Sequence, residues 1–197
     1  VRARLELADR VRPDAAEMVS ALKGAGLRMG ILSGDREAAV RPVARAVGVT
    51  EVWSGLAPTD KVAALSKARR DGEVVGMVGD GLNDAPALAA ADVGIALAGG
   101  TDLTREAGDV VLLGNELRRL PWLIALARDT RRVIGQNLAW AFGYNAIMLA
   151  LAFFGRLHPL AAAVLMLISS FFVLGNSLRL RKAAPAEGAP PPARELT

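Results

Sequence analysis

The run GDGLNDAPAL carries the residues best suited to chemistry. Asp80 stands between Gly79 and Gly81, and Asn83 and Asp84 follow closely. Glycine lets a phosphate or an ion approach the backbone, and Mg²⁺ takes oxygen ligands, often one or two carboxylates beside substrate phosphates. We predict that Asp80 holds Mg²⁺ and Asn83 contacts a phosphoryl oxygen, with Asp84 as a supporting carboxylate or a helix N-cap. An ordinary glycine-rich turn is the alternative interpretation.

Two more polar turns precede this run. SGD contains Ser33, Gly34 and Asp35, and APTDK ends in Lys61. A serine hydroxyl with its backbone N–H, and a lysine ammonium, can both stabilise a transferring phosphoryl group. Taken singly, Ser33 fits an ordinary turn and Lys61 a solvated lysine at a helix start. Their joint placement favours a phosphate site, with the backbone around Gly34, Asp35 and the two glycines of GDG contacting the ligand.

Helical and strand patterns alternate through the first part of the chain. Helices are predicted at 12–26, 36–48 (disturbed by Pro42), 58–72, 83–91 and 101–108, and strands at 27–35, 49–55, 73–80, 92–97 and 109–114. This alternation predicts an α/β fold with a parallel sheet covered on both faces. Ligands bind beyond the carboxyl ends of the strands in such sheets. SGD and GDGLND lie directly at such ends, whereas APTDK precedes a helix.

The pattern changes after Gly114. Residues 117–135 read as an amphipathic linker helix, residues 136–155 and 159–178 as membrane-spanning helices, and residues 183–197 as a disordered Pro-rich tail. Two consecutive charge-free runs near spanning length favour a membrane pair over a buried core hairpin, which is the alternative. Arginine and lysine clusters flank the pair, so both outer ends are expected in the cytoplasm.

Composition removes several classes of function. The chain has 197 residues and no cysteine, which excludes disulfides, Cys-based zinc sites and a thiol nucleophile. The net charge is +4, but aromatic residues make up only 5%, so the basic residues do not form the aromatic-interleaved surface typical of nucleic-acid binding. No nucleic-acid partner is expected.

In their order and spacing, SGD, PTDK and GDGLNDAPALAAADVGIAL resemble the later motifs of haloacid-dehalogenase-like phosphotransferases. The long last form resembles P-type ATPases in particular. The resemblance implies a partial Rossmann-like haloacid-dehalogenase-like domain over residues 1–116, followed by two transmembrane helices. It also implies catalytic roles for Lys61, Ser33, Asn83 and Asp84, with Mg²⁺ and ATP as cofactors. Threonine is usual where Ser33 stands, a change that keeps the hydroxyl.

The first motif of that family, DKTGT, contains the phosphorylated aspartate and does not occur in this sequence. Asp9 lacks that context and does not replace it. The resemblance therefore implies the C-terminal portion of a pump, inactive by itself, whose acceptor lies in the remaining upstream part. A membrane-tethered phosphatase would need its own nucleophilic aspartate.

Polar groups also occur inside the predicted spans. Tyr144 and Asn145 lie in the first, and Met166 and Ser169 in the second. Polar groups at membrane depth tend to line a pathway, and a thioether suits Cu(I). Hydrogen bonding between helices and methionine as a packing filler are the alternatives.

NLAWAFGYN and MxxSS followed by NSLRLR resemble the closing helices of heavy-metal P-type ATPases, in particular the Cu(I)/Ag(I) branch. This implies ATP-driven export of Cu⁺ or Ag⁺ by a multi-pass protein of the cell membrane, in contact with the lipid bilayer and with a copper chaperone as a partner. A zinc, potassium or other cation pump, or a non-catalytic membrane protein that binds Mg²⁺ or phosphate, remains an alternative function.

Overall fold

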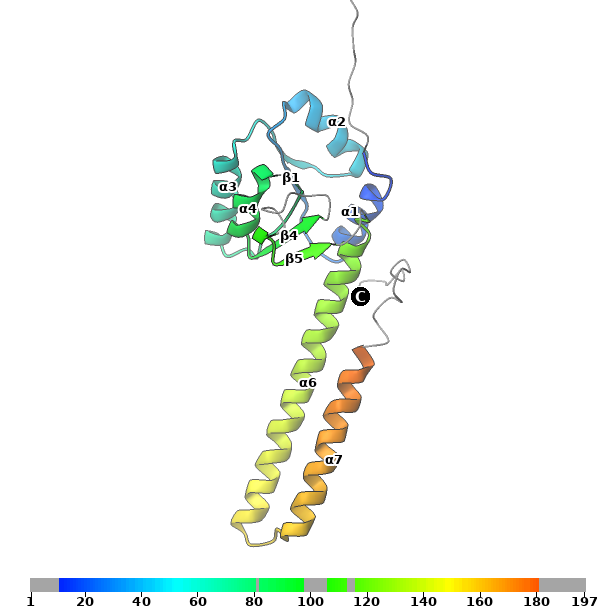
Figure 1. The fold of residues 1–197 in the computed structure, drawn as a ribbon, viewed down its shortest axis with the longest axis vertical. Coiled ribbons are helices and arrows are strands. Elements are labelled where there is room, and N and C mark those ends of the chain that lie inside the picture. Colours follow the sequence, from blue (N-terminus) through cyan, green and yellow to red (C-terminus); the bar gives the residue numbers. More distant parts are fainter. Residues whose placement is uncertain (1–10, 81, 98–105, 113–115, 181–197) are drawn as a thin grey trace, which may run out of the picture. The chain divides into compact units, whose positions relative to one another are not determined.

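A computed structural model describes residues 11–80, 82–97, 106–112 and 116–180 (Figure 1). The chain forms two compact units, one ending at Arg119 and one beginning at Leu120. Gly81, most of the predicted 101–108 helix and the predicted tail lie outside the described residues.

Short helices and strands alternate in the first unit. They are α1 (Ala15–Gly24), β1 (Gly30–Leu32), α2 (Glu37–Val47), β2 (Glu51–Trp53), α3 (Pro58–Arg70), β3 (Gly76–Gly79), a 3₁₀ turn (Leu82–Asp84), α4 (Ala85–Ala90), β4 (Val93–Leu97) and β5 (Val110–Leu112). All the strand pairs are parallel, so the α/β prediction with a parallel sheet is confirmed.

The described strands form two separate ladders. β1 pairs with β2, while β3, β4 and β5 pair in that order. In the register, Ile31 lies opposite Val52, and Val78 lies opposite Ile95. Among the described residues, β1 and β3 therefore each have one edge without a strand partner.

The hydrophobic core lies where α3 and α4 cover β3 and β4. It consists of Leu65, Met77, Ala87, Leu88 and Ala96. Along β3, burial alternates, and the side chain of Val78 is 39% exposed. The prediction of a sheet covered on both faces is thus not met at Val78, whose side of β3 is partly open among the described residues.

Pro42 does not interrupt α2. The helix continues from Glu37 to Val47 and ends at Gly48, whose φ of 79° is readily adopted only by glycine. A proline removes the hydrogen bond to the carbonyl four residues earlier, here that of Ala38. Ala38 is exposed, so water can satisfy its carbonyl.

The second unit contains two long helices, α6 (Arg119–Phe153) and α7 (Pro159–Leu178). The predicted linker 117–135 and span 136–155 thus form one continuous helix of 35 residues. Among the described residues, α7 is the one helix long and apolar enough to cross a membrane by length and composition. Gln136, Asn137 and Asn145 lower the hydropathy of the corresponding part of α6, so the two-span prediction is not confirmed.

Candidate functional site

The SGD turn follows β1 directly. The backbone N–H of Ser33 donates to the Trp53 carbonyl oxygen at 2.9 Å and extends the pairing of β1 with β2. The expectation that this N–H binds phosphate is therefore wrong, because the sheet already uses it. The Ser33 hydroxyl accepts from the Asp35 backbone N–H at 3.1 Å and lies 3.3 Å from the Asp35 carboxylate. The hydroxyl donates its one proton to the Asp35 carboxylate, so it can donate to a ligand only after turning away from that partner.

Backbone hydrogen bonds join the SGD turn to the loop that leads into α3. The N–H of Gly55 donates to the Asp35 carbonyl at 2.8 Å, and the N–H of Leu56 donates to the Ser33 carbonyl at 3.0 Å. Two residues later α3 starts, with Pro58 at its first position. The Asp60 carboxylate accepts the Ala57 N–H at 2.9 Å and fixes that start. SGD and PTDK are thus held side by side.

Lys61 lies in the first turn of α3 and is only 8% exposed. Its Nζ donates to Asp84 Oδ1 at 2.6 Å. The alternative of a solvated lysine is excluded, since this is a largely buried ion pair. An ammonium has three N–H donors, so Lys61 can hold Asp84 and still donate to a phosphoryl oxygen.

Asp84 precedes α4 but makes no side-chain cap there. Its carboxylate turns toward Lys61 instead, which favours the supporting role over the N-cap. Gly79 makes this possible: a Cβ on Gly79 would lie 2.8 Å from the Asp84 Cβ and 3.0 Å from Oδ2. Real Cβ contacts are essentially never under 3.0 Å. The end of β3 therefore accepts Asp84 only because residue 79 has no side chain.

Asp80 follows β3, and its side chain is 58% exposed. The Arg12 guanidinium lies 3.9 Å from Asp80 Oδ2, a distance at which exposed groups attract each other weakly. Asn83 and Gly34 are exposed as well. These groups are exposed, whereas the Lys61 and Asp84 side chains are only 10% and 17% exposed.

The donor set suits Mg²⁺ bound together with a phosphate. The described residues contain no group of three or more His, Cys, Asp or Glu side chains that could hold a metal ion. Mg²⁺ seldom needs such a cage, because it keeps several waters and binds one or two carboxylates beside substrate phosphates. Asp80 is an accessible carboxylate of this kind and fits the ion.

The chain is similar to known proteins over most of its length. Residues 1–92 match the haloacid dehalogenase-like hydrolase family. Cation-transporting P-type ATPase B of Mycobacterium tuberculosis is 45% identical over 181 residues, 92% of this chain and 24% of that protein. The copper-exporting P-type ATPase of Mycobacterium leprae is 45% identical over 177 residues, 90% of this chain and 23% of that protein. This chain is a homologue of the heavy-metal P-type ATPases.

A solved structure also matches this P-type ATPase homologue. The crystal structure of a zinc-transporting PIB-type ATPase in the E2.Pi state superposes with a TM-score of 0.82 and 38% identity, covering 88% of this chain and 28% of that one. The chain spans about a quarter of the length of the curated relatives it matches.

The four residues predicted to bind the transported ion in this P-type ATPase homologue lie on α6 and α7. The Trp140 indole N–H donates to the Ser169 hydroxyl oxygen at 3.1 Å. Tyr144 and Asn145 lie four and five residues further along α6 than Trp140. Met166 is one helical turn before Ser169, and its side chain is 65% exposed. Ser169 is thus oriented by α6, while Met166 remains accessible.

Other polar contacts hold α6 to α7. Asn137 donates to Ser177 at 3.0 Å and accepts from Asn176 at 2.9 Å. The Trp140 and Phe172 rings stack with centroids 4.3 Å apart. Neither these amides nor Trp140 stands out in the sequence. Each of the two helices carries polar or aromatic residues that can be read from the sequence. Which of them pair can be known only once the register between the helices is known.

Proposed function

We propose that this chain is the C-terminal portion of an ATP-driven heavy-metal pump that works through an aspartyl-phosphate intermediate. The observation that carries the proposal is the chain of contacts that joins three loops. SGD is hydrogen-bonded to the loop before α3, Lys61 at the start of α3 is paired with Asp84, and Asp84 lies against the end of β3. The homology to P-type ATPases supports the same reaction.

Each residue of the site has a defined task in this reaction. Lys61 places a positive charge beside the transferring phosphoryl group, with Asp84 holding its direction. The Asn83 side-chain amide donates to a phosphoryl oxygen, and the Ser33 hydroxyl does so once it turns away from Asp35. Asp80 holds Mg²⁺, which when bound neutralises charge on those oxygens. Such catalysis consists of positioning and electrostatic stabilisation around an in-line attack.

The nucleophile in this proposal is an aspartate outside this chain. Its strand would pair with the open edges of β1 and β3 and join the two ladders into one sheet. The strand order would then be β2, β1, the inserted strand, β3, β4, β5. The connection from β1 to β2 leads away from the inserted strand on one side, and the connection from β3 to β4 leads away on the other. Ligands bind at such a switch point, and the loops with Ser33 and Asp80 follow the two flanking strands.

The ion that we propose is Cu⁺ or Ag⁺, moved by export. Met166 offers a soft thioether suited to Cu(I), and Tyr144, Asn145 and Ser169 lie near it along the helix pair. A relative with 45% identity is named as copper-exporting. Zinc is the second candidate, since the matching crystal structure is of a zinc-transporting protein. No acidic residue occurs in α7, which favours copper by the same family resemblance.

We further propose that α6 from residue 136 and α7 both cross the cell membrane, with both outer ends in the cytoplasm. None of the α7 residues is buried in the structure, as suits a helix that meets lipid. Three arginines precede the first span and basic residues follow the second, in agreement with the positive-inside rule. The partners in this proposal are the bilayer, the remaining upstream part of the pump and a copper chaperone.

Phosphorylation with labelled ATP tests the proposed function. The full-length pump that contains this chain should take up acid-stable label in the presence of Mg²⁺ and Cu⁺, and this chain alone should take up none. Label on the chain alone would show that the acceptor lies within it. A full-length protein that binds Mg²⁺ and phosphate but takes up no label would be a non-catalytic binding protein instead.

Replacing Met166 by Leu should separate ion binding from phosphorylation. The change keeps the apolar volume but removes the thioether, so phosphorylation by inorganic phosphate should stay intact while Cu⁺-dependent turnover falls by about tenfold, the loss expected for about 1.4 kcal/mol of binding. Met148→Leu on α6 makes the same chemical change and should leave turnover unaltered. Normal copper transport by Met166→Leu would remove this residue from the ion site.

A further inference from the structure

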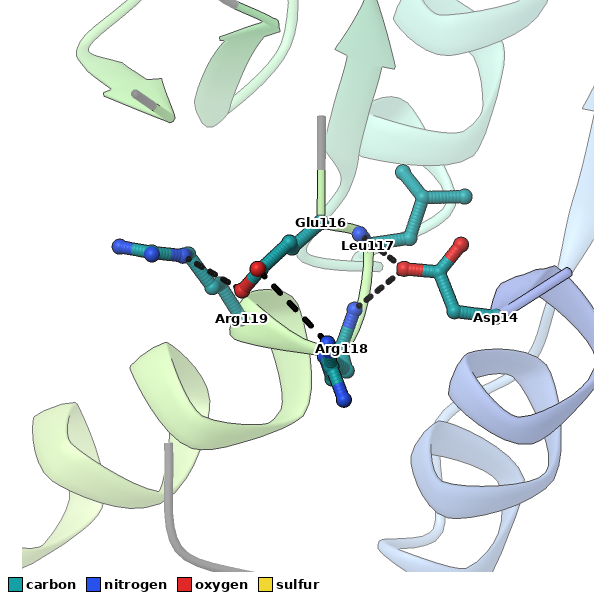
Figure 2. A network of polar contacts seen from close by, with 5 residues as sticks. All are labelled: Asp14, Glu116, Leu117, Arg118 and Arg119. Atoms are coloured by element: carbon teal, nitrogen blue, oxygen red, sulfur yellow. Dashed lines mark hydrogen bonds and ion pairs between the residues drawn. The ribbon is translucent and has the colours of Figure 1, made fainter. Parts of the chain in front are cut away.

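Asp14 stands at the N-cap position of α1 but does not cap that helix. Its φ and ψ are −88° and −2°, and its side chain makes no hydrogen bond to the α1 backbone. An aspartate at this position ordinarily accepts an N–H from the first turn of its own helix. Here the half-buried carboxylate points away from α1 (Figure 2).

The Asp14 carboxylate instead accepts the backbone N–H groups that precede α6. Oδ2 lies 2.6 Å from the Leu117 nitrogen and 3.4 Å from the Arg118 nitrogen, across a separation of 103 residues to Leu117 (Figure 2). Leu117 and Arg118 form the turn that leads directly into α6, and an ionised acceptor makes the stronger kind of hydrogen bond. The start of α6 therefore depends on a side chain from the start of α1.

Glu116, three residues before α6, contacts the same turn. Its carboxylate lies 3.2 Å from Arg119 Nε and 3.7 Å from an Arg118 guanidinium nitrogen. Dashed lines join the Glu116 carboxylate to both arginine side chains (Figure 2), so their guanidinium groups form ion pairs with this carboxylate. Asp14 thus interacts with the backbone of this turn, which is the part that sets the position of the helix start.

The same short segment also touches the candidate phosphate site. Arg12, two residues before Asp14, lies 3.9 Å from Asp80, and Pro13 between them has a φ fixed by its ring. The tripeptide Arg12–Asp14 therefore contacts Asp80 at one end and the turn that leads into α6 at the other.

We propose that Asp14 is a positioning residue that makes the start of α6 follow the state of the phosphate site. A ligand shifts a conformation only if it interacts differently with its two states. The long Arg12–Asp80 contact meets this condition, because Mg²⁺ at Asp80 competes with the guanidinium while a phosphoryl group attracts it. Movement of Arg12 passes through Pro13 to Asp14 and so to the N–H groups of Leu117 and Arg118. The proposal rests on the proposed function, which places phosphate beside Asp80.

Three variants of the full-length pump test this role. Asp14→Ala removes the acceptor, and Asp14→Asn keeps an uncharged acceptor of the same shape. Asp92→Ala is the matched control, because the Asp92 carboxylate also accepts a distant backbone N–H, that of Val75 at 2.9 Å, without touching α6 or Asp80. A purely structural loss should be alike in the two alanine variants.

We expect the level of phosphorylation of Asp14→Ala by inorganic phosphate to stay within about twofold of that of the unaltered pump. Its metal-dependent turnover should fall at least about fivefold, the lower end of typical allosteric coupling. Asp14→Asn should lie between, and Asp92→Ala should keep its turnover. In the unaltered pump, Mg²⁺ with inorganic phosphate should change hydrogen exchange at the Leu117 and Arg118 amides, and in Asp14→Ala this response should be lost.

The outcomes separate this proposal from the one on which it rests. If the unaltered pump takes up no phosphate, the proposed function fails, and the exchange response to Mg²⁺ and phosphate still decides the role of Asp14. Equal turnover in Asp14→Ala and the unaltered pump, an equal loss in Asp92→Ala, or an exchange response that survives in Asp14→Ala would each overturn the proposal. Should Asp14→Ala not fold, the same readouts on Asp14→Asn decide it.

Discussion

Replacing Asp80 by Asn should lower phosphorylation of the full-length pump by ATP at least about a hundredfold, the loss typical of removing one preorganised stabiliser of transition-state charge. The amide keeps the shape of the side chain but not the negative charge that Mg²⁺ requires. Because Asp80 is 58% exposed and its contact with Arg12 is long, the free energy of unfolding should change by less than about 0.5 kcal/mol.

Labelled ATP measures the Asp80 effect, and thermal unfolding measures the stability of the same samples. Asp92→Asn serves as the control, since Asp92 lies before β4, at the end of the sheet away from Asp80, and its exchange should leave labelling intact. An Asp80→Asn pump that takes up label at the unaltered rate would remove this carboxylate from the metal site.

Lys61→Met should destabilise the region of α3 and α4 by about 3 kcal/mol, near the lower end of the range for breaking a buried ion pair. The Lys61 and Asp84 side chains are only 10% and 17% exposed, so removing the ammonium leaves the Asp84 carboxylate without compensation. Asp84→Leu should lower the stability by a similar amount, because it leaves the Lys61 ammonium buried without its partner.

The double variant Lys61→Met with Asp84→Leu should be more stable than either single variant, because no unpaired buried charge remains. All three should fail to form phosphoenzyme. Hydrogen exchange of the α3 and α4 amides in the full-length protein gives the local free energy of opening. Strictly additive effects of the two single changes would show that the residues are not coupled.

Much of this site follows from sequence, for a simple geometric reason. Ser33 and Asp80 each come directly after an apolar strand, and parallel strands present their carboxyl ends at one edge. The burial of Lys61 could not be predicted in the same way, because its partner Asp84 lies 23 residues further on. A charged residue in a polar helix start normally faces water, and only the tertiary contact reverses this.

Local patterns also misled at two helix boundaries. The sequence RPDA predicts a helix that begins at Arg12 with Pro13 in its first turn, whereas α1 begins at Ala15 and Asp14 serves the start of α6. The loss of charged residues from Gln136 onward suggests a boundary between the linker helix and the span, yet α6 passes through it without a break. Once a helix has nucleated, each added residue gains a hydrogen bond. A change in hydropathy therefore marks a change in the surroundings of the helix and not in its backbone conformation.

The open edges of β1 and β3 also bear on how this chain behaves during synthesis. An unpaired strand edge presents a row of free backbone donors and acceptors that any extended peptide can use. If the acceptor strand proposed above fills the gap between the two described ladders, that row invites association with other copies until this strand is in place, and parallel sheets form slowly enough for this to matter. A pump whose acceptor strand is made first would protect its own nascent sheet, whereas this chain produced by itself would be prone to aggregate.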